Sequence, residues 1–353
     1  MANKFTKKIA GEWLLVLSIA GLVITSVFLR RFPVYSRTDL KVIYILFIFL
    51  VIIKGLEGTN FLQAAAYRLR KGRWLALRLI LLTGLLSIFV TNDVALLTIV
   101  PLTLALDVDN RGMLVMLETL AANAASPLTP FGNPQNIFLY YFYGLHPWEF
   151  VRAIAPLCLV TMCCILFLGW KKAGTVIKEN GVEDLEIRWK AYGYLAFFLV
   201  FVLAVLRVLP LWIGAGVIIY SLVLDRKSLL IDWLLLAIFL AFFGLTDNLM
   251  NMVSFHLEGP MEAFLYPVLG SQVMSNVPSA LFFADFTRNW KALLWGVSVG
   301  GFGNLIGSLA SLISYRLYRA KLHNANGFLI KFHMYSYMIF LLGIATYLVL
   351  AFC

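Results

Sequence analysis

The chain has 353 residues, of which 61% are hydrophobic and 13% are charged, and its formal net charge is +11. A soluble domain of this length cannot bury so much apolar surface, and no polar stretch is long enough to fold alone. The composition therefore excludes a soluble protein and a soluble domain on a membrane anchor, and it predicts a protein that crosses the lipid bilayer several times.

The positive charge is spread over short loops between apolar segments. Loops of this kind set the orientation of a membrane protein, so we expect no nucleic-acid partner. The first apolar run follows the basic segment MANKFTKK and has no small-residue cleavage site. We interpret it as a membrane span and not as a signal peptide. Apolar segments of full length are expected at about residues 13–29, 40–56, 150–170, 192–208, 211–224, 231–247 and 332–352.

Two pairs of shorter apolar segments flank a polar tip. Residues 75–90 and 94–106 flank Thr91-Asn92-Asp93, and residues 261–274 and 279–287 flank Ser275-Asn276. An arm of about 13 residues reaches only ~20 Å as a helix, which is less than the ~30 Å of the hydrocarbon core. The pattern predicts two re-entrant helical hairpins, within residues 75–106 and 261–287.

Two further segments, 112–143 and 290–317, are long enough to cross but are interrupted in the middle. The first interruption contains three prolines in Ser126-Pro127-Leu128-Thr129-Pro130-Phe131-Gly132-Asn133-Pro134-Gln135-Asn136, and the second reads Gly300-Gly301-Phe302-Gly303-Asn304-Leu305-Ile306-Gly307-Ser308. Proline breaks a helix, and unwound backbone at membrane depth persists only when protein buries it or when it lines a cavity. Both segments are therefore predicted to be broken helices.

The same order of hairpin and broken helix occurs twice. With the N-terminus in the cytoplasm and the C-terminus outside, most of the 29 Lys and Arg residues lie in cytoplasmic loops, and the two hairpins enter from opposite sides. The sequence thus predicts an all-helical polytopic membrane protein with an inverted repeat. The repeats are residues 1–170 and 192–353, and a cytoplasmic linker, 171–191, joins them.

Hairpin tips and helix breaks free backbone donors and acceptors that can hold an ion or a small anion at mid-membrane. Amide and hydroxyl side chains at these places add to them, although such residues also serve as simple helix caps. The candidate binding residues are Thr91, Asn92, Asp93, Ser126, Thr129, Gly132, Asn133, Asn136, Ser275, Asn276, Gly303, Asn304, Gly307 and Ser308.

Asp93 has two compatible interpretations. A carboxylate beside a mid-membrane tip is costly unless a proton or a cation neutralises it, which suggests that it handles a coupling ion. Aspartate is also a suitable N-cap for a helix that begins at Val94. We interpret Glu118 and Asp247 as packing or boundary acids. The four cysteines and four histidines show no metal-ligand spacing, and no nucleophile with a base is visible, so we expect no tightly bound cofactor and no enzyme.

The patterns TNDVALLTIVPLTL, NAASPLTPFGNPQN, SQVMSNVPSALFF and GGFGNLIGSLASL resemble the ion transporter superfamily. This superfamily includes arsenite efflux permeases, divalent-anion/sodium symporters and one class of sodium/proton antiporters. The resemblance covers nearly all of residues 10–352 and is greatest to a small bacterial branch of anion permeases.

The resemblance implies an elevator mechanism, in which hairpins and broken helices form a mobile transport domain on a scaffold that is often dimeric. In the symporters, a Ser-Asn-Thr sequence at each tip contacts the substrate carboxylates and nearby sodium ions. This implies a substrate site at Thr91, Asn92, Ser275 and Asn276. Sodium is expected at Asn92, Asp93, Gly132, Asn276 and Gly307.

The chain departs from the symporter pattern at Asp93 and Val277, where the symporters keep threonine. An Asn-Asp tip is similar to the arsenite permeases, whose substrate is neutral at pH 7. The expected function is secondary active transport of a small anion or oxyanion, coupled to Na⁺ or H⁺. The alternatives are a sodium/proton antiporter or an arsenite efflux permease, and then a channel. A homodimer in a bacterial or archaeal cytoplasmic membrane is expected.

Overall fold

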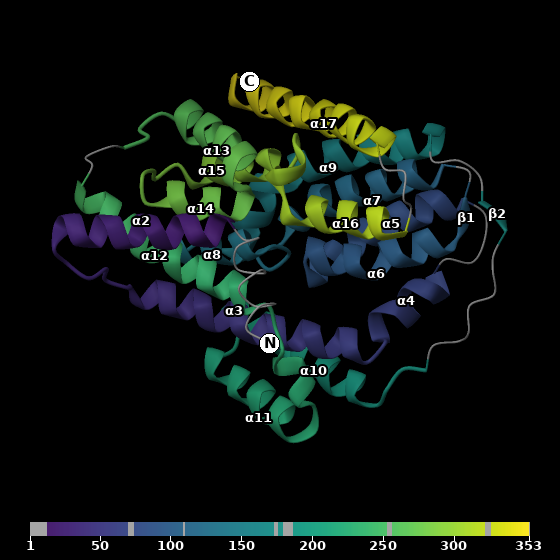
Figure 1. Ribbon diagram of the computed structural model, residues 1–353, viewed down its shortest axis with the longest axis horizontal. Helices are drawn as coiled ribbons and strands as arrows, with labels where there is room; N and C mark the ends of the chain where they lie inside the picture. The colour runs from purple at the N-terminus through teal and green to yellow at the C-terminus, as the bar shows by residue number, and fades with distance from the viewer. Residues whose placement is uncertain are drawn as a thin grey trace.

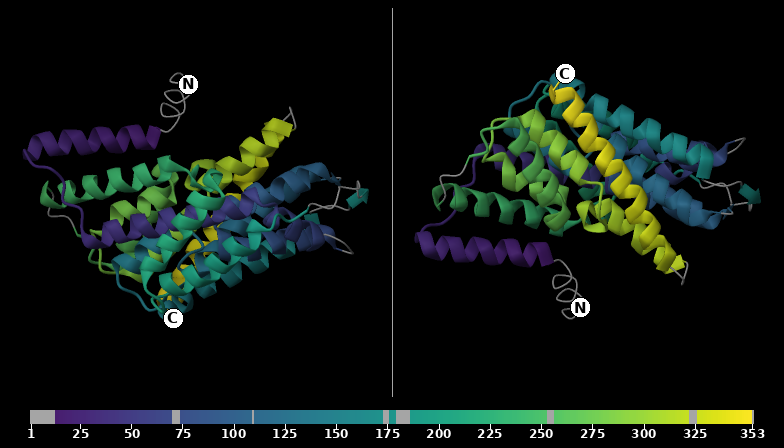
Figure 2. Two further views of the ribbon diagram at one scale, coloured as in Figure 1. Left: turned by 90° about the horizontal axis from the view of Figure 1, so that it is seen from below. Right: turned by 90° about the horizontal axis from the view of Figure 1, so that it is seen from above.

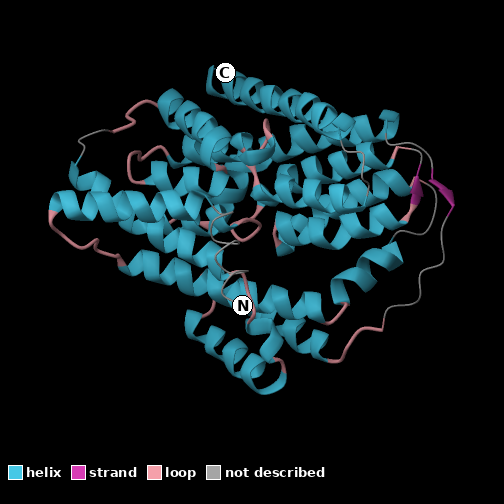
Figure 3. Cartoon of the chain, viewed as in Figure 1, coloured by secondary structure: helices cyan, strands magenta, loops and turns pink. Residues whose placement is uncertain are grey.

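The computed structural model describes residues 13–69, 74–108, 110–172, 176–178, 186–252, 256–321 and 326–352, and almost all of them are helical (Figure 3). A short antiparallel pair departs from the all-helical expectation. It joins β1 (Asp107–Val108) to β2 (Val176–Lys178) at one end of the molecule (Figure 1). By length and composition, three helices in the described part can cross a membrane: Pro147–Lys171, Arg226–Met252 and Gly327–Ala351.

One group of helices packs around α3 (Arg37–Gly58). Ser36 and Asp39 form a capping box at the N-terminus of α3. Helices α10 (Lys190–Val205), α11 (Gly214–Leu224) and α12 (Trp233–Met252) contact α3, and α2 (Trp13–Leu29) lies along α12. Short 3-10 turns, η2 (Leu211–Ile213) and η3 (Arg226–Leu229), precede α11 and α12. Figures 1 and 2 show this group along one side of the molecule.

The predicted span at 192–208 is too long by three residues. Helix α10 ends at Val205, and Arg207 has a left-handed backbone with φ 65°. The residues that follow the helix end are apolar, so hydrophobicity alone does not mark the end. Pro210 then disfavours helical backbone for the residue before it, and η2 begins after that.

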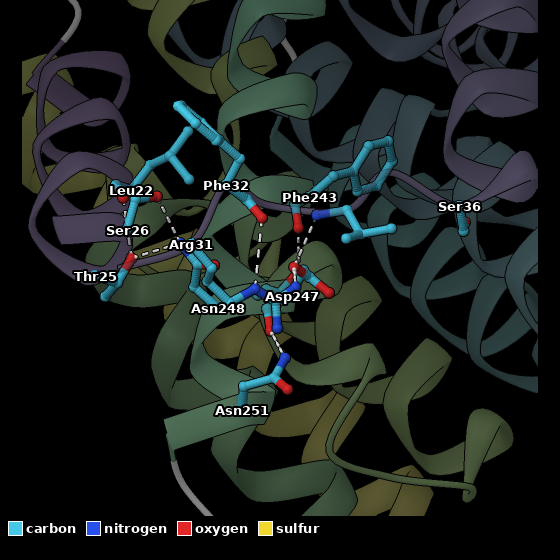
Figure 4. A network of polar contacts seen from close by, with 12 residues as sticks. Leu22, Thr25, Ser26, Arg31, Phe32, Ser36, Phe243, Asp247, Asn248 and Asn251 are labelled. Atoms are coloured by element: carbon cyan, nitrogen blue, oxygen red, sulfur yellow. Dashed lines mark hydrogen bonds and ion pairs between the residues drawn. The ribbon is translucent and has the colours of Figure 1, made fainter. Parts of the chain in front are cut away.

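A polar network ties the end of α2 to α12 (Figure 4). The Arg31 guanidinium pairs with the Asp247 carboxylate, which also accepts a hydrogen bond from the Val34 N–H at 2.9 Å. The neighbouring Asn248 donates to Thr25 Oγ1 at 3.1 Å and to Ser26 Oγ at 2.8 Å. Asp247 thus serves as a partner for a loop arginine, which agrees with its interpretation as a boundary acid.

The second group contains two hairpins and two interrupted helices. The hairpins are α5 (Leu75–Val90) with α6 (Asn92–Ala105), and α13 (Pro260–Met274) with α14 (Asn276–Ala284). The interrupted helices are α7 (Arg111–Ala125), η1 (Ser126–Leu128) and α8 (Pro134–Phe142), and then α15 (Trp290–Gly300), η4 (Leu305–Gly307) and α16 (Leu309–Lys321). Two long helices, α9 (Pro147–Lys172) and α17 (Asn326–Phe352), pack against this group and each other.

The two groups are packed against each other. Helix α3 contacts α8, α12 contacts α14, and the short helix α4 (Phe61–Leu69) contacts α6. Within the second group, α5 packs along α7 and α13 packs along α15. The second hairpin also reaches α8, while α6 of the first hairpin lies on α16. Each hairpin therefore packs against the broken helix of the other half.

Candidate functional site

Each hairpin turns on a single residue with an unusual backbone. Thr91 has φ 88° and ψ 150°, and Ser275 has φ 74° and ψ 160°. This combination is adopted almost only by glycine and costs about 1–3 kcal/mol for other residues. Helix α6 already begins at Asn92, so Asp93 lies in the first helical turn. The N-cap interpretation of Asp93 is therefore wrong: Thr91 occupies that position, because the chain reverses at one residue and not at three.

The first tip is fixed through Asn123, a buried residue of α7 that the sequence analysis did not select. Asn92 Nδ2 donates to Asn123 Oδ1 at 3.0 Å, and Ser308 Oγ donates to the same oxygen at 3.0 Å. Asn123 Nδ2 donates to Ser311 Oγ at 3.2 Å and to the Gly301 carbonyl at 3.4 Å. One amide therefore joins the first tip to the second helix break.

The second tip lies against the same break. Ser275 Oγ donates to the Gly307 carbonyl and to Asn276 Oδ1, both at 3.4 Å. A Cβ on Gly301 would come within 3.1 Å of Asn276 Nδ2, so glycine at this position allows the amide to approach the backbone. Through Gly301 and Ser308, the two tips share one helix break.

Gln272 organises the second break from three residues before the tip, and the sequence analysis missed it too. Its Nε2 donates to the carbonyls of Gly300 (2.8 Å) and Phe302 (3.0 Å). Asn304 donates back to the Gln272 carbonyl at 2.7 Å and caps η4 through Oδ1. Gly303 has φ 91°, and a Cβ there would come within 2.3 Å of Gln272 Oε1. Gly303 and Asn304 thus shape the backbone in this structure.

The first break is held by short-range contacts. Asn133 Nδ2 donates to Ser126 Oγ at 2.9 Å, and Asn136 Nδ2 donates to the carbonyls of Thr129 (2.7 Å) and Pro127 (3.1 Å). Thr129 Oγ1 donates to the Ile88 carbonyl near the first tip at 2.7 Å. The break is therefore packed against the hairpin beside it.

Two amide oxygens in this break are left without partners. Asn133 Oδ1 and Asn136 Oδ1 are buried and accept no hydrogen bond from the described residues. Buried acceptors without donors are costly, and a cation such as Na⁺ is one group that satisfies them. The half-buried Asp93 carboxylate also makes no hydrogen bond or ion pair within the described residues.

Three of the five residues expected to hold sodium have oxygens that accept hydrogen bonds in this arrangement, and the expectation itself stays a prediction. Asn92 Oδ1 accepts from the Asp93 N–H at 3.1 Å, and the Gly307 carbonyl and Asn276 Oδ1 accept from Ser275. Within the described residues, no cluster of three or more His, Cys, Asp or Glu is placed to hold a metal. Among the described residues of this region, side-chain oxygens without a hydrogen bond lie on Asn133 and Asn136, next to Gly132, and on Asp93.

Four helices begin at the tips and breaks: α6, α8, α14 and α16. Their first turns offer free N–H groups and positive dipole ends, and the helices that end there offer free carbonyls. The polar side chains between them are almost fully buried, including Asn92, Ser126, Asn276 and Ser308. Groups of these kinds can bind an anion or a cation, and here the side chains that carry them are packed against one another.

Comparison with known proteins places the chain in a transporter family. Residues 6–300 match the family model CitMHS, described as citrate transporter. An uncharacterized transporter of Methanocaldococcus jannaschii is 32% identical over 86% of this chain and 88% of its own length. The inner membrane protein YbiR of Escherichia coli is 34% identical over 81% of each chain. The silicon efflux transporter LSI3 of Oryza sativa is 27% identical over 44% of this chain and 35% of its own.

Proposed function

Because the chain belongs to the CitMHS citrate transporter family, we propose that it is a secondary active transporter of a small anion or oxyanion, coupled to Na⁺ or H⁺. It is a membrane transporter and not an enzyme, as its family and the names of its relatives indicate. The observation that carries the proposal is the meeting of two strained tips at one buried helix break, which Asn123 and Ser275 bridge.

The proposed mechanism uses two inverted repeats, residues 1–170 and 192–353, joined by a linker at 171–191. Helices α8 and α16 begin 175 residues apart, at Pro134 and Leu309, and the tips are 184 residues apart. In each half, a side chain of the break donates to the carbonyl three residues before the tip: Thr129 to Ile88, and Asn304 to Gln272. Equivalent hydrogen bonds at equivalent positions of the two halves support a duplicated unit.

The elevator step is proposed from the division of the helices into two groups. The hairpins, the broken helices, α9 and α17 form the moving part, and α2, α3, α10, α11 and α12 form the scaffold. We further propose a scaffold-mediated homodimer in a cytoplasmic membrane, with the N-terminus inside and the C-terminus outside. An inner membrane relative in Escherichia coli supports this location.

An anionic substrate is favoured by the donors at the site. Four helix N-termini and the amides of Asn92 and Asn276 surround the tips, and such donors bind carboxylates and oxyanions. The family description names citrate. Sodium coupling is supported by the free oxygens of Asn133 and Asn136.

A second candidate function rests on Asp93. Its carboxylate stands at the first tip without a partner among the described residues, where it repels an anion and attracts a cation or a proton. This favours a sodium/proton antiporter or a permease for an uncharged oxyacid such as arsenite. The silicon efflux relative supports the second of these.

Uptake into proteoliposomes tests the proposal. Labelled citrate, arsenite and silicate are offered with and without gradients of Na⁺ and H⁺. We expect saturable uptake of one of them that responds to a gradient. Asn92→Ala and Asn276→Ala should each lower it at least about tenfold, because a hydrogen bond to a charged ligand is worth about 1.5–3 kcal/mol.

The matched control is Asn251→Ala, which removes an exposed asparagine at the end of α12 that donates to the Asp247 carbonyl. It should transport like the parent protein. Thermal melting of each variant separates lost function from lost folding. A flux that rises linearly with concentration and ignores both gradients would indicate a channel and overturn the proposal.

A further inference from the structure

We propose that Glu118, buried in α7, is the group that binds the coupling proton, and that hydroxyl and amide groups on α7 and α16 mark the route from it to the hairpin tips. The inference rests on the proposed transport function and goes beyond it, because it assigns the coupling ion and the residue that carries it. Glu118 lies outside the set of residues that the tips and breaks bring together.

The carboxyl of Glu118 is fully buried and only half satisfied. Thr103 Oγ1 of α6 donates to Glu118 Oε1, while Oε2 has no hydrogen-bond partner among the described residues. An ionised carboxylate at this depth without a cation costs several kcal/mol, so the packed state favours the neutral acid. Its proton then belongs on Oε2, the oxygen that no donor occupies.

The second half of the chain shows that packing alone does not require an acid here. With the spacing of 175 residues between the broken helices, the position that corresponds to Glu118 is Leu293 of α15. Leu293 is also fully buried. One repeat therefore fills the position with a leucine, and the other keeps a group that can gain and lose a proton.

Two separate hydrogen-bonded pairs on α7 and α16 follow Glu118 in the direction of the tips. Its neighbour Thr119 shares a hydrogen bond with Ser314 of α16, one turn before the bond between Asn123 and Ser311 on the same two helices. Asn123 then binds Asn92 at the first tip. Thr119, Ser311 and Ser314 are all buried. Rotating hydroxyls can pass a proton or hold water, so these pairs lie along the route that the proposal assigns between the acid and the site.

The proton balance is simple. Glu118 takes one proton from water on one side of the membrane when the moving part opens there. It carries the proton as a neutral carboxylic acid and releases it to water on the other side, leaving a carboxylate. No covalent bond other than O–H forms or breaks.

Other titratable groups lie on the helices that pack against α7. They include Asp93 of α6, Arg78 of α5, Cys158 of α9, Tyr315 and Tyr318 of α16, and Lys331 of α17. Glu118 Oε1 accepts from Thr103, and Glu118 Oε2 has no hydrogen-bond partner in the described part of the chain. The contribution of Glu118 to pH-dependent transport is therefore measured by comparing variants at Glu118 itself.

The test compares Glu118→Gln with Glu118→Leu in proteoliposomes. Glutamine copies the neutral acid, and leucine copies the second repeat. In the parent protein, one pH unit across the membrane should change substrate accumulation up to about tenfold per coupled proton. In both variants, substrate accumulation should no longer depend on the pH gradient. Substrate exchange at equal pH on both sides of the membrane is the reference for this comparison. Glu149→Gln, an exposed acid in the first turn of α9, should keep the response.

A second measurement does not depend on transport. Infrared spectra of the purified protein at acidic and alkaline pH should contain a carboxylic-acid C=O band that titrates in the parent and is missing in Glu118→Gln. If both Glu118 variants keep the pH-gradient response, or if the band persists in Glu118→Gln, the assignment of Glu118 is wrong while the transporter proposal stands. If the parent shows the band but no saturable transport, the proposed function fails instead.

Discussion

Thr91 and Ser275 carry the clearest sign of function at the level of single residues. Each holds a backbone with positive φ and extended ψ, which glycine adopts more easily. A β-branched threonine is an especially unfavourable choice for such a position. Keeping hydroxyl side chains at both tips suggests that the hydroxyls themselves are needed for binding.

Thr91→Gly separates strain from function. Relief of the backbone strain gains about 1–3 kcal/mol, and the greater freedom of glycine in the unfolded chain costs about 0.4–1 kcal/mol. The first effect is larger, so the melting temperature should stay the same or rise. Substrate uptake should fall at least about tenfold, since a hydroxyl at the site is lost.

Asn60→Gly is the matched control, because Asn60 also has a positive φ (62°) but lies between α3 and α4, away from the tips. It should keep full uptake. If Thr91→Gly transports normally, the tip hydroxyl has no part in binding. A lower melting temperature for Thr91→Gly would show that the hydroxyl is needed for folding.

At the level of elements, the first helix break depends on Gly132. A Cβ at this position would stand 2.1 Å from the Ser126 carbonyl oxygen, which is backbone and cannot swing away. The same loop carries the two free amide oxygens of Asn133 and Asn136. The tight packing of one residue therefore fixes the geometry of the oxygens proposed for sodium.

Gly132→Ala should destabilise the protein by about 1–3 kcal/mol through overpacking and should weaken any effect of sodium on melting. The control is Gly58→Ala at the end of α3, where an added Cβ would meet no atom within 4 Å. Melting curves with and without sodium measure both effects. Equal curves for the two variants would contradict the close packing of this break.

At the level of the whole molecule, Arg207 joins the two helix groups. From the loop after α10, its guanidinium donates to the carbonyls of Tyr140 (3.3 Å), Gly144 (3.3 Å) and Leu145 (3.2 Å) at the end of α8. The Arg207 guanidinium also lies over the rings of Tyr140 and Tyr141, at 4.7 and 5.1 Å from their centroids. In the elevator proposal, these contacts hold one position of the moving part.

Arg207→Ala should shift the balance between positions of the moving part. Hydrogen bonds to a charged group are worth about 1.5–3 kcal/mol, so the population of other positions should rise about tenfold or more. Distances between spin labels on cysteines that replace Trp148 and Trp212 would report this shift, in a background without the native cysteines. Both tryptophans are exposed and belong to different groups.

Arg226→Ala is the control, because Arg226 Nε donates within the scaffold to the Leu222 carbonyl at 3.1 Å. Its distance distribution should match the parent. If the distance distribution between the spin labels and the transport rate are both unchanged in Arg207→Ala, this contact does not hold a moving domain in place.

The sequence by itself determined the membrane class, the short arms of both hairpins and the two helix breaks. These features follow from the length of apolar runs and from proline and glycine, and both are local properties of the chain. The helices that flank the tips end at Val90 and Met274, as their apolar runs indicate. The family resemblance added transport, which the CitMHS match supports.

The tertiary structure decided which residues meet. Asn123 and Gln272 looked like ordinary polar residues of apolar helices, and their partners lie as far as 188 residues away in the chain. It also placed Asp93 within α6 and brought Thr103 onto Glu118. Such pairings depend on how interleaved helices pack, and no local pattern specifies that, because one helix face can be buried against many partners.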